Sequence, residues 1–214
     1  MTRAPRVYVV DDDLHVLSAL RRLLEASGYD VVTHDSANEF LARHDPALPG
    51  CVLLDIGMTE LNGLETQQKM LELGVSRPII FVTGYDDVRT SVEAMKSGAH
   101  DYLVKPISDK VLLATVEAAV SSDLKAFRER EDLAKLQKQW RSLTIREREV
   151  MLQVIRGRLN KQIAGDLNIV EKTVKVHRAR VMEKMGVRSV AGLVHIAEKL
   201  QRSGSAEFPA ADHR

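Results

Sequence analysis

Five side chains that could bind a metal ion or a phosphate group stand at the ends of short apolar runs. They are Asp11, Asp12, Asp55, Thr83 and Lys105. Neighbouring carboxylates repel one another and raise each other's pKa unless a cation neutralises them. A hard divalent cation such as magnesium suits such a group and usually keeps several waters and a phosphate oxygen. Lys105 could then hold an anionic group as a point charge, and Thr83 could donate a hydrogen bond to it.

Each of these residues also has an ordinary structural explanation. Asp55 could cap a helix, the paired acids could form a solvated turn, and the hydroxyl and the ammonium could simply lie at the surface. Asp13, the next acid, is expected to be a helix N-cap and not a ligand. All the ordinary explanations must hold together at one sheet edge for the site to disappear, so the pattern favours a site.

The elements that would position these side chains alternate between strand and helix. Strands are expected over 6–10, 30–34, 51–55, 79–83 and 101–104, and helices over 14–27, 36–42, 64–73 and 88–95 and from 108 onwards. The alternation predicts an α/β fold with a parallel sheet covered on both faces. Ligands of such sheets bind outside the carboxyl ends of the strands, where the five side chains would meet.

The net charge of +1 hides two halves of opposite sign. Residues 1–122 carry 11 Lys and Arg against 18 Asp and Glu, a net −7, whereas residues 141–203 carry 14 against 6, a net +8. Residues 123–140 carry 5 against 4, and residues 204–214 carry 1 against 2. Two domains with two tasks are expected, and the basic one is a candidate for binding nucleic acid.

Composition excludes several classes of protein. Cys51 is the only cysteine, which excludes an internal disulfide and a cysteine-based zinc site, and it is expected in the core. No apolar run approaches the length of about 18 residues that a membrane span needs. The N-terminus lacks the apolar core of a signal peptide, so a cytoplasmic protein is expected.

A helical connector is expected over residues 123–140. No Pro or Gly occurs between Ile107 and Gly157, and the connector is rich in good helix formers. Apolar residues recur every seven positions, but their partner positions are mostly polar, so a semi-rigid helix is favoured over both a strong coiled coil and a flexible linker. Trp140 is expected to pack between the connector and the second domain.

Four helices are expected in the basic segment 141–203, followed by a disordered tail over 204–214. Thr144 and Glu147 have capping-box spacing at the start of the first. Helices over 161–167 and 171–185, joined by a short turn, match a helix-turn-helix unit, and a last helix covers 189–200. The second helix of this unit is cationic, and such a helix is the usual reader of the major groove.

Four short motifs in the acidic half resemble the receiver domain of bacterial two-component response regulators. They are Val10-Asp11-Asp12, Leu54-Asp55, Thr83-Gly84 and Lys105-Pro106. The resemblance covers about residues 5–122 and implies a flavodoxin-like fold with strand order 2-1-3-4-5. It implies that Asp55 is the nucleophile that accepts a phosphoryl group from a histidine kinase.

The same resemblance assigns roles to the neighbouring residues. Magnesium would be bound directly by Asp12, through water by Asp11, and by Asp55 and the carbonyl of Gly57. Lys105 would pair with the phosphoryl oxygens, and Thr83 would move toward them. Tyr102 would be the aromatic switch that turns inward behind Thr83. The Lys105-Pro106 bond would be cis, a form that only X-Pro bonds reach cheaply.

The loop after Asp55 departs from the family pattern. The family normally has Met-Pro where this chain has Met58-Thr59, although Gly63 is retained. The loop therefore lacks a fixed φ, which leaves its order and the lifetime of the phosphate open. Gly57 has no side chain to shield the phosphoryl group, so a short-lived phosphorylated state is expected. A half-life of many hours would contradict this.

Three motifs in the basic half resemble the LuxR-type helix-turn-helix of NarL/FixJ response regulators, over residues 141–200. They are Leu143-Thr144-x-Arg146-Glu147-x-Glu149-Val150, Asn160-Lys161-x-Ile163-Ala164-x-x-Leu167 and Thr173-Val174-Lys175-x-His177. The resemblance implies that Lys175 contacts guanine acceptors and Val176 a thymine methyl. The residues expected to hold phosphates are Lys161, Lys172, Thr173 and Arg178. Val170 stands where the family often has a capping Ser, a loss of about 1 kcal/mol.

The expected protein is a two-domain transcriptional regulator without substrate turnover. Phosphorylation of Asp55 would change the face formed by about residues 88–104, promote a homodimer and favour promoter binding, with RNA polymerase as a further partner. One alternative is a phosphorylation-independent regulator, supported only by Thr59. Another alternative is a phosphatase or phosphotransferase. Against it, the chain has no evident substrate-binding domain and no second acid/base residue after Asp55, where Gly57 stands.

Overall fold

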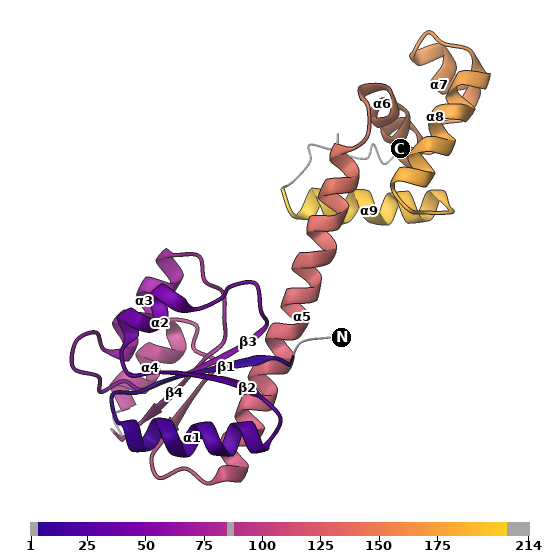
Figure 1. Cartoon of the computed structure of the whole chain (residues 1–214). Helices are drawn as coiled ribbons and strands as arrows, with labels where there is room; N and C mark the ends of the chain where they lie inside the picture. Colours follow the sequence, from indigo (N-terminus) through magenta and orange to yellow (C-terminus); the bar gives the residue numbers. More distant parts are fainter. Residues whose placement is uncertain (1–3, 85–87, 205–214) are drawn as a thin grey trace. The chain divides into compact units, whose positions relative to one another are not determined.

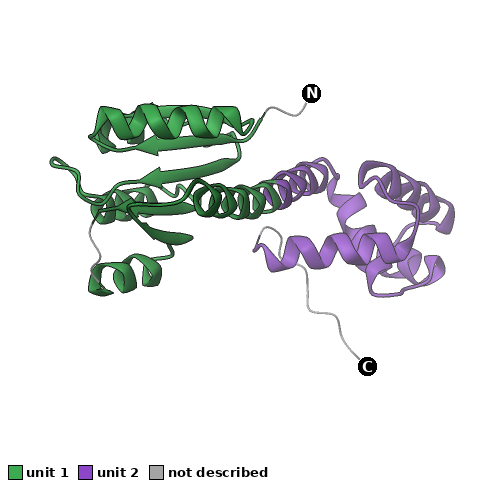
Figure 2. Ribbon diagram, turned by 90° about the horizontal axis from the view of Figure 1, so that it is seen from below, with its two compact units in different colours: residues 1–127 green, residues 128–214 purple. Residues whose placement is uncertain are grey.

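The computed structural model describes residues 4–84 and 88–204 and forms two compact units, Met1–Phe127 and Arg128–Arg214 (Figure 2). The division falls inside the segment 123–140 that the sequence predicts as a connector. The tail predicted over 204–214 lies, from residue 205 onwards, outside the described residues. Each unit is considered by itself below.

Unit 1 contains a parallel sheet of five strands in the order β2-β1-β3-β4-β5 (Figure 1). The strands are β1 (Arg6–Val10), β2 (Asp30–His34), β3 (Gly50–Leu54), β4 (Ile79–Thr83) and β5 (Asp101–Val104). This order confirms the flavodoxin-like fold expected from the sequence. Val10 pairs with Leu54, and Thr83 pairs with Val104, so strand ends that are distant in sequence share one edge.

Helices cover both faces of this sheet. One face packs against α1 (Leu14–Ala26) and the first half of α5 (Asp109–Arg141). The other packs against α2 (Ala37–Arg43), α3 (Gly63–Glu72) and α4 (Val88–Lys96). Every residue of β3 and of β4 is buried, as expected for parallel strands between two layers of helices.

Side-chain caps fix the turns that follow the first two strands. Asp13 accepts a hydrogen bond from the amide of His15 at 2.7 Å, which confirms its role as the N-cap of α1. Ser36 accepts from the amide of Glu39 at 3.3 Å at the start of α2. The backbone that leaves β1 is therefore held just beyond Asp11 and Asp12.

A single helix, α5, contains 33 residues and belongs to both units. It runs through the whole segment 123–140 without a Gly or Pro. In unit 1 its buried apolar residues are Leu112, Val116, Ala119 and Val120. In unit 2 its last turns pack against the core through Leu133, Leu136 and Trp140. The lone tryptophan therefore contributes to the core of unit 2.

Unit 2 continues with four further helices, α6 (Ile145–Ile155), α7 (Asn160–Asp166), α8 (Glu171–Lys184) and α9 (Val190–Arg202). Helix α7 begins and ends one residue earlier than predicted, whereas α9 ends two residues later. Such shifts are common because helix ends fray. In the part of the chain that the structure describes, no helix is long and apolar enough to cross a membrane.

The starts of α6 and α8 differ in their caps. Thr144 and Glu147 form the predicted capping box at the start of α6. Asn168, with a φ of 52°, makes the turn between α7 and α8, a backbone conformation that Asn adopts more readily than most residues. Val170 is the N-cap of α8, and its side chain makes no capping hydrogen bond.

Candidate phosphoacceptor site and nucleic-acid interface

Strand β3 carries Asp55 to the carboxyl edge of the sheet. The amide of Asp55 donates to the carbonyl of Val10 at 2.9 Å, which extends the β1–β3 ladder by one residue. Asp55 is only 8% exposed, and Asp11, the first residue after β1, is 3% exposed. Two buried carboxylates thus lie at the ends of neighbouring strands.

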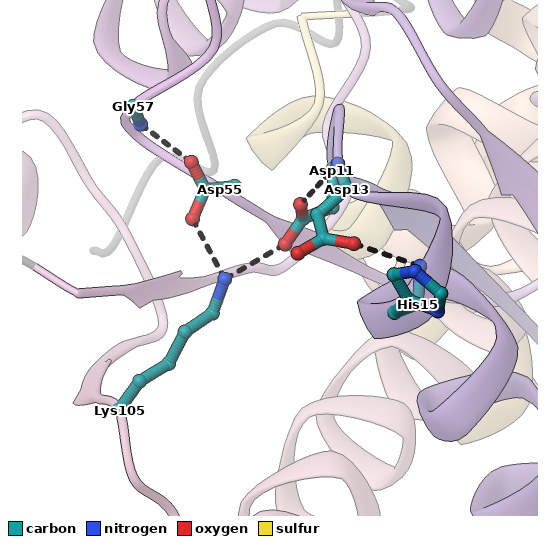
Figure 3. Close-up of polar contacts among 6 residues, drawn as sticks. All are labelled: Asp11, Asp13, His15, Asp55, Gly57 and Lys105. Carbon is teal, nitrogen blue, oxygen red and sulfur yellow. Dashed lines mark hydrogen bonds and ion pairs between the residues drawn. The ribbon is translucent and has the colours of Figure 1, made fainter.

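The ammonium of Lys105 joins these two carboxylates (Figure 3). Its Nζ lies 2.8 Å from Asp11 Oδ2 and 3.1 Å from Asp55 Oδ1. Its backbone amide donates to the carbonyl of Thr83 at 2.8 Å, which fixes the base of the side chain beside the end of β4. The cluster unites residues that lie 50 and 94 positions apart in the sequence.

Burial and hydrogen bonding act in opposite directions on these groups. Burial raises the pKa of Asp11, and hydrogen bonds from Lys105 and the Asp13 amide oppose this effect without reversing it. Burial lowers the pKa of Lys105, but its bonds to Asp11 and Asp55 outweigh that effect and hold the pKa above its usual value. Lys105 is therefore a fixed cation between the two carboxylates, and burial prevails in setting the pKa of Asp11.

The turn after β3 holds the second oxygen of the Asp55 carboxylate. The amide of Gly57 donates to Asp55 Oδ2 at 2.6 Å (Figure 3). A Cβ on Gly63 would lie 2.6 Å from the carbonyl oxygen of Asp55 and 3.0 Å from a ring carbon of Phe81. Only glycine fits there, because the backbone of the turn approaches that closely.

The other residues of the predicted phosphoryl site lie on β4 and β5. Thr83 is fully buried at the end of β4. Tyr102, on β5, packs with its ring centroid 6.4 Å from that of Phe81. The Lys105-Pro106 peptide bond is cis, as the resemblance to receiver domains implies.

Asp12 differs from the other two acids because it is exposed. With Thr59 and Glu60 it lines a neighbouring cavity of about 340 Å³. Within residues 4–84 and 88–204, no three His, Cys, Asp or Glu residues are grouped closely enough to hold a metal ion. Magnesium needs few protein ligands because it keeps several waters. The carboxylate oxygens of Asp11 and Asp55, which meet at Lys105, fit this ion, and Asp12 follows Asp11 in the chain.

The six residues predicted to contact DNA lie on α7 and α8. Four of them are exposed: Lys161, Lys172, Lys175 and Val176. The other two, Thr173 and Arg178, are partly buried. Five of the six belong to α8, the second helix of the predicted helix-turn-helix. Of the Lys and Arg side chains on α8, Lys172, Lys175 and Arg180 are exposed.

Two contacts of these residues were not foreseen from the sequence. Arg178 Nη1 donates to Asn160 Oδ1 at 3.1 Å. Lys175 Nζ lies 3.3 Å from Glu171 Oε1. The second pair has helical i,i+4 spacing, a signal that was available in the sequence. The first joins two helices across 18 positions, and no local pattern indicates it.

Comparisons with known proteins identify the family. The model of the "Response regulator receiver domain" matches residues 7–117, and that of "Bacterial regulatory proteins, luxR family" matches residues 141–197. The transcriptional regulatory protein FixJ of Rhizobium meliloti (strain 1021) is 37% identical over 191 residues, which cover 89% of this chain and 94% of that protein. The chain belongs to the NarL/FixJ family of response regulators.

Other members of this family are similar along most of the chain. Response regulator protein TodT of Pseudomonas putida is 40% identical over 201 residues, 94% of this chain and 88% of that protein. The solved structure of response regulator StyR has a TM-score of 0.87 at 42% identity and covers 92% of this chain and all of that one. Full-length FixJ from B. japonicum has a TM-score of 0.56 at 36% identity, covering 94% and 99%. The protein is a DNA-binding transcriptional response regulator.

Proposed function

We propose that Asp55 accepts a phosphoryl group from a sensor histidine kinase and that this modification increases DNA binding by unit 2. The observation that supports it most directly is the Lys105 ammonium held between Asp55 and Asp11 at the sheet edge. A carboxylate oxygen of Asp55 attacks phosphorus, the bond from phosphorus to the kinase histidine nitrogen breaks, and that nitrogen keeps the electron pair. The protein is an acceptor and not an enzyme with substrate turnover.

Magnesium is the proposed cofactor of this transfer. Asp11, Asp12, Asp55 and the carbonyl of Gly57 would hold it, because all of them offer oxygen ligands. When bound, it supplies positive charge that offsets the repulsion between the acids and the incoming phosphoryl group. The burial of Asp11 supports this proposal, because a cation beside that carboxylate would offset the cost of burying its charge.

Three residues respond to the phosphoryl group in this proposal. Lys105 exchanges Asp55 Oδ1 for a phosphoryl oxygen, because the carboxyl group loses its negative charge when it becomes an acyl phosphate. Thr83 donates its hydroxyl to another phosphoryl oxygen. Tyr102 turns inward behind Thr83. Its ring now packs against Phe81, which lies on the neighbouring strand β4.

The changed face would then pair with that of a second copy. Helix α4 bears three exposed apolar side chains, Val88, Val92 and Met95, at 74%, 45% and 45% exposure. Their spacing of four and three residues puts them on one side of the helix, which supports α4 and β5 as the dimer face. A dimer would present two basic units to a two-fold promoter site, where RNA polymerase is the further proposed partner.

DNA binding in this proposal divides between bases and phosphates. Lys175 and Val176 reach base edges, because both are exposed near the start of α8. Phosphate contacts come from Lys161, Lys172, Thr173 and Arg178, which fix register and make affinity depend on salt. The hydrogen bond that Arg178 donates to Asn160 Oδ1 holds its side chain in place for such a contact.

The test compares wild type with Asp55→Asn, which is nearly the same size but cannot form the acyl phosphate. DNA sequences are first selected from a random pool, and affinity is then measured with and without acetyl phosphate and magnesium. Acetyl phosphate should raise the DNA affinity of wild type at least about fivefold, the lower end of common allosteric couplings. It should leave the DNA affinity of Asp55→Asn unchanged.

Each rival has its own outcome in this experiment. Donor-independent binding by both proteins would support the phosphorylation-independent regulator. Turnover of a small phosphate ester would support the enzyme. The decay of the phosphorylated wild type also tests the exposed loop at Gly57, where a short lifetime is expected.

A further inference from the structure

The face that α8 presents to solvent is acidic at its first residue. Its exposed residues are Glu171, Lys172, Lys175, Val176, Ala179, Arg180 and Glu183. Glu171 stands one helical turn before Lys175, on the same side of the helix. The N-terminal residues of a recognition helix are those that contact base edges. A carboxylate therefore lies among the groups expected to enter the major groove.

Stability alone is a weak reason for this carboxylate. Its Oε1 lies 3.3 Å from Lys175 Nζ, and the two side chains are 47% and 64% exposed. An exposed pair of this kind contributes little because water and salt screen it. Glu171 also complements the positive end of the helix dipole, as any acid at that position would. Neither effect depends on facing DNA.

Binding to DNA would bring the Glu171 carboxylate close to negatively charged phosphates. Phosphates on both sides of the groove repel a carboxylate, so its entry is unfavourable unless it accepts a hydrogen bond from a base. Two major-groove groups can donate, the N4 amino group of cytosine and the N6 amino group of adenine. Adenine carries the N7 acceptor beside its donor, which would repel the second carboxylate oxygen. Cytosine is therefore the base that suits Glu171.

We propose that Glu171 determines part of the DNA specificity by accepting a hydrogen bond from cytosine N4. Its place one helical turn before Lys175 puts the carboxylate beside the lysine that is expected to contact guanine. Four residues span about 6 Å along a helix, and base pairs are spaced about 3.4 Å apart. The cytosine therefore lies within two base pairs of the guanine that Lys175 contacts. This inference rests on the proposed contact of Lys175 with base edges.

The experiment is selection of bound DNA from a random pool by the full chain, with acetyl phosphate and magnesium. The proteins compared are wild type, Glu171→Ala, Glu171→Gln and Lys175→Ala. Wild type should prefer cytosine about tenfold at the predicted position, and Glu171→Ala should lose that preference. Glu171→Gln should favour adenine instead, because an amide offers both a donor for N7 and an acceptor for N6. Lys175→Ala should lose the preference for guanine at the neighbouring position.

Glu183→Gln is the matched control, since it removes one negative charge from the same exposed face at the other end of α8. It should bind all sequences slightly more tightly without changing any preference. Sequence preferences of Glu171→Ala that equal those of wild type overturn the inference, whatever the gain in affinity. If wild type enriches no sequence at all, the proposed function itself fails, and the two failures are thus distinguished.

Discussion

One lysine pairs with buried acid in each unit and lowers the pKa of that acid, but the net shift is upward for Asp11 and downward for Glu147. In unit 1, Lys105 is shared by Asp11 and Asp55, and burial prevails in raising the pKa of Asp11. In unit 2, Lys184 Nζ lies 2.6 Å from Glu147 Oε2. Burial raises the pKa of Glu147, but bonds from Lys184 and the Thr144 amide outweigh it, so the pKa is lowered. The hydrogen bonds thus prevail over burial in setting the pKa of Glu147, whereas burial prevails in setting that of Asp11.

Glu147→Gln should destabilise unit 2 in a pH-dependent manner. At pH 7 the free energy of unfolding should fall by about 1–3 kcal/mol, because Lys184 loses its charged partner while the amide can still complete the capping box. A lowered pKa in the folded state stabilises the fold above the ordinary carboxyl value of 4.5, and this contribution is lost as pH falls through the folded-state pKa. The difference between the two proteins should therefore shrink below pH 4.5.

Urea unfolding followed by the fluorescence of Trp140 measures this difference, because the only tryptophan packs against the unit 2 core. Glu149→Gln is the control. Its exposed pair with Arg146, at 2.9 Å, should contribute less than about 1 kcal/mol. Equal losses in the two variants, or a loss for Glu147→Gln that is the same at every pH, would contradict the assignment.

The sequence predicts the receiver side chains better than their contacts. Asp55 and Lys105 could be placed together because parallel strands end at one edge of the sheet, whatever the side-chain packing. The exposure of Asp12 and the bond from the Gly57 amide depend on how the loops pack, which no local pattern encodes. The pairing of Arg178 with Asn160 likewise requires that two helices meet.

At the scale of elements, the starts of α8 and α9 differ in whether the N-cap side chain accepts a hydrogen bond. The N-cap of α9 is Ser189, whose hydroxyl accepts from the amide of Gly192 at 3.1 Å. The N-cap of α8 is Val170, which offers no such acceptor. The missing cap at Val170 was identified from the sequence because a cap depends on one residue and its immediate neighbours, whereas Ser189 was expected inside the helix and is its N-cap. Exact helix ends were less well predicted, as α7 and α9 show.

Val170→Ser should stabilise unit 2 by about 1 kcal/mol, because a hydroxyl at this position can accept from the amide of Thr173 or its neighbour. Val170 is 67% exposed, so little apolar burial is lost. Its φ of −80° and ψ of 149° are already those of an N-cap. Ser189→Ala, the opposite change at α9, should cost a similar amount. Trp140 fluorescence in urea measures both, and a destabilised Val170→Ser would contradict the prediction.

At the scale of the whole molecule, an acidic receiver unit and a basic DNA-binding unit share one helix. The charges of the two halves, −7 over residues 1–122 and +8 over residues 141–203, follow from 11 basic against 18 acidic and 14 basic against 6 acidic residues. Each unit has its own core, and α5 contributes to both. A stiff connector limits how two DNA-binding units of a dimer can be spaced, and a flexible one lowers their effective concentration at paired half-sites.

Arg128→Gly/Glu129→Gly should therefore weaken the coupling between phosphorylation and DNA binding. Both residues are exposed and lie at the division between the units, and the double change leaves the net charge unaltered. Two glycines disfavour the helix by about 1 kcal/mol each relative to alanine. The ratio of DNA affinities with and without acetyl phosphate should fall toward one, whereas a ratio of at least about fivefold is expected of wild type.

Arg128→Ala/Glu129→Ala separates helix continuity from loss of the side chains, because it removes the same groups and keeps a strong helix former at both positions. The alanine variant should retain the wild-type ratio, and both variants should be phosphorylated at Asp55 and unfold in urea like wild type when Trp140 is followed. A glycine variant with the wild-type ratio would show that α5 need not be continuous for signalling. Equal falls of the affinity ratio in both variants would assign the effect to the two charged side chains. Only a fall confined to the glycine variant supports transmission of the signal through an unbroken helix.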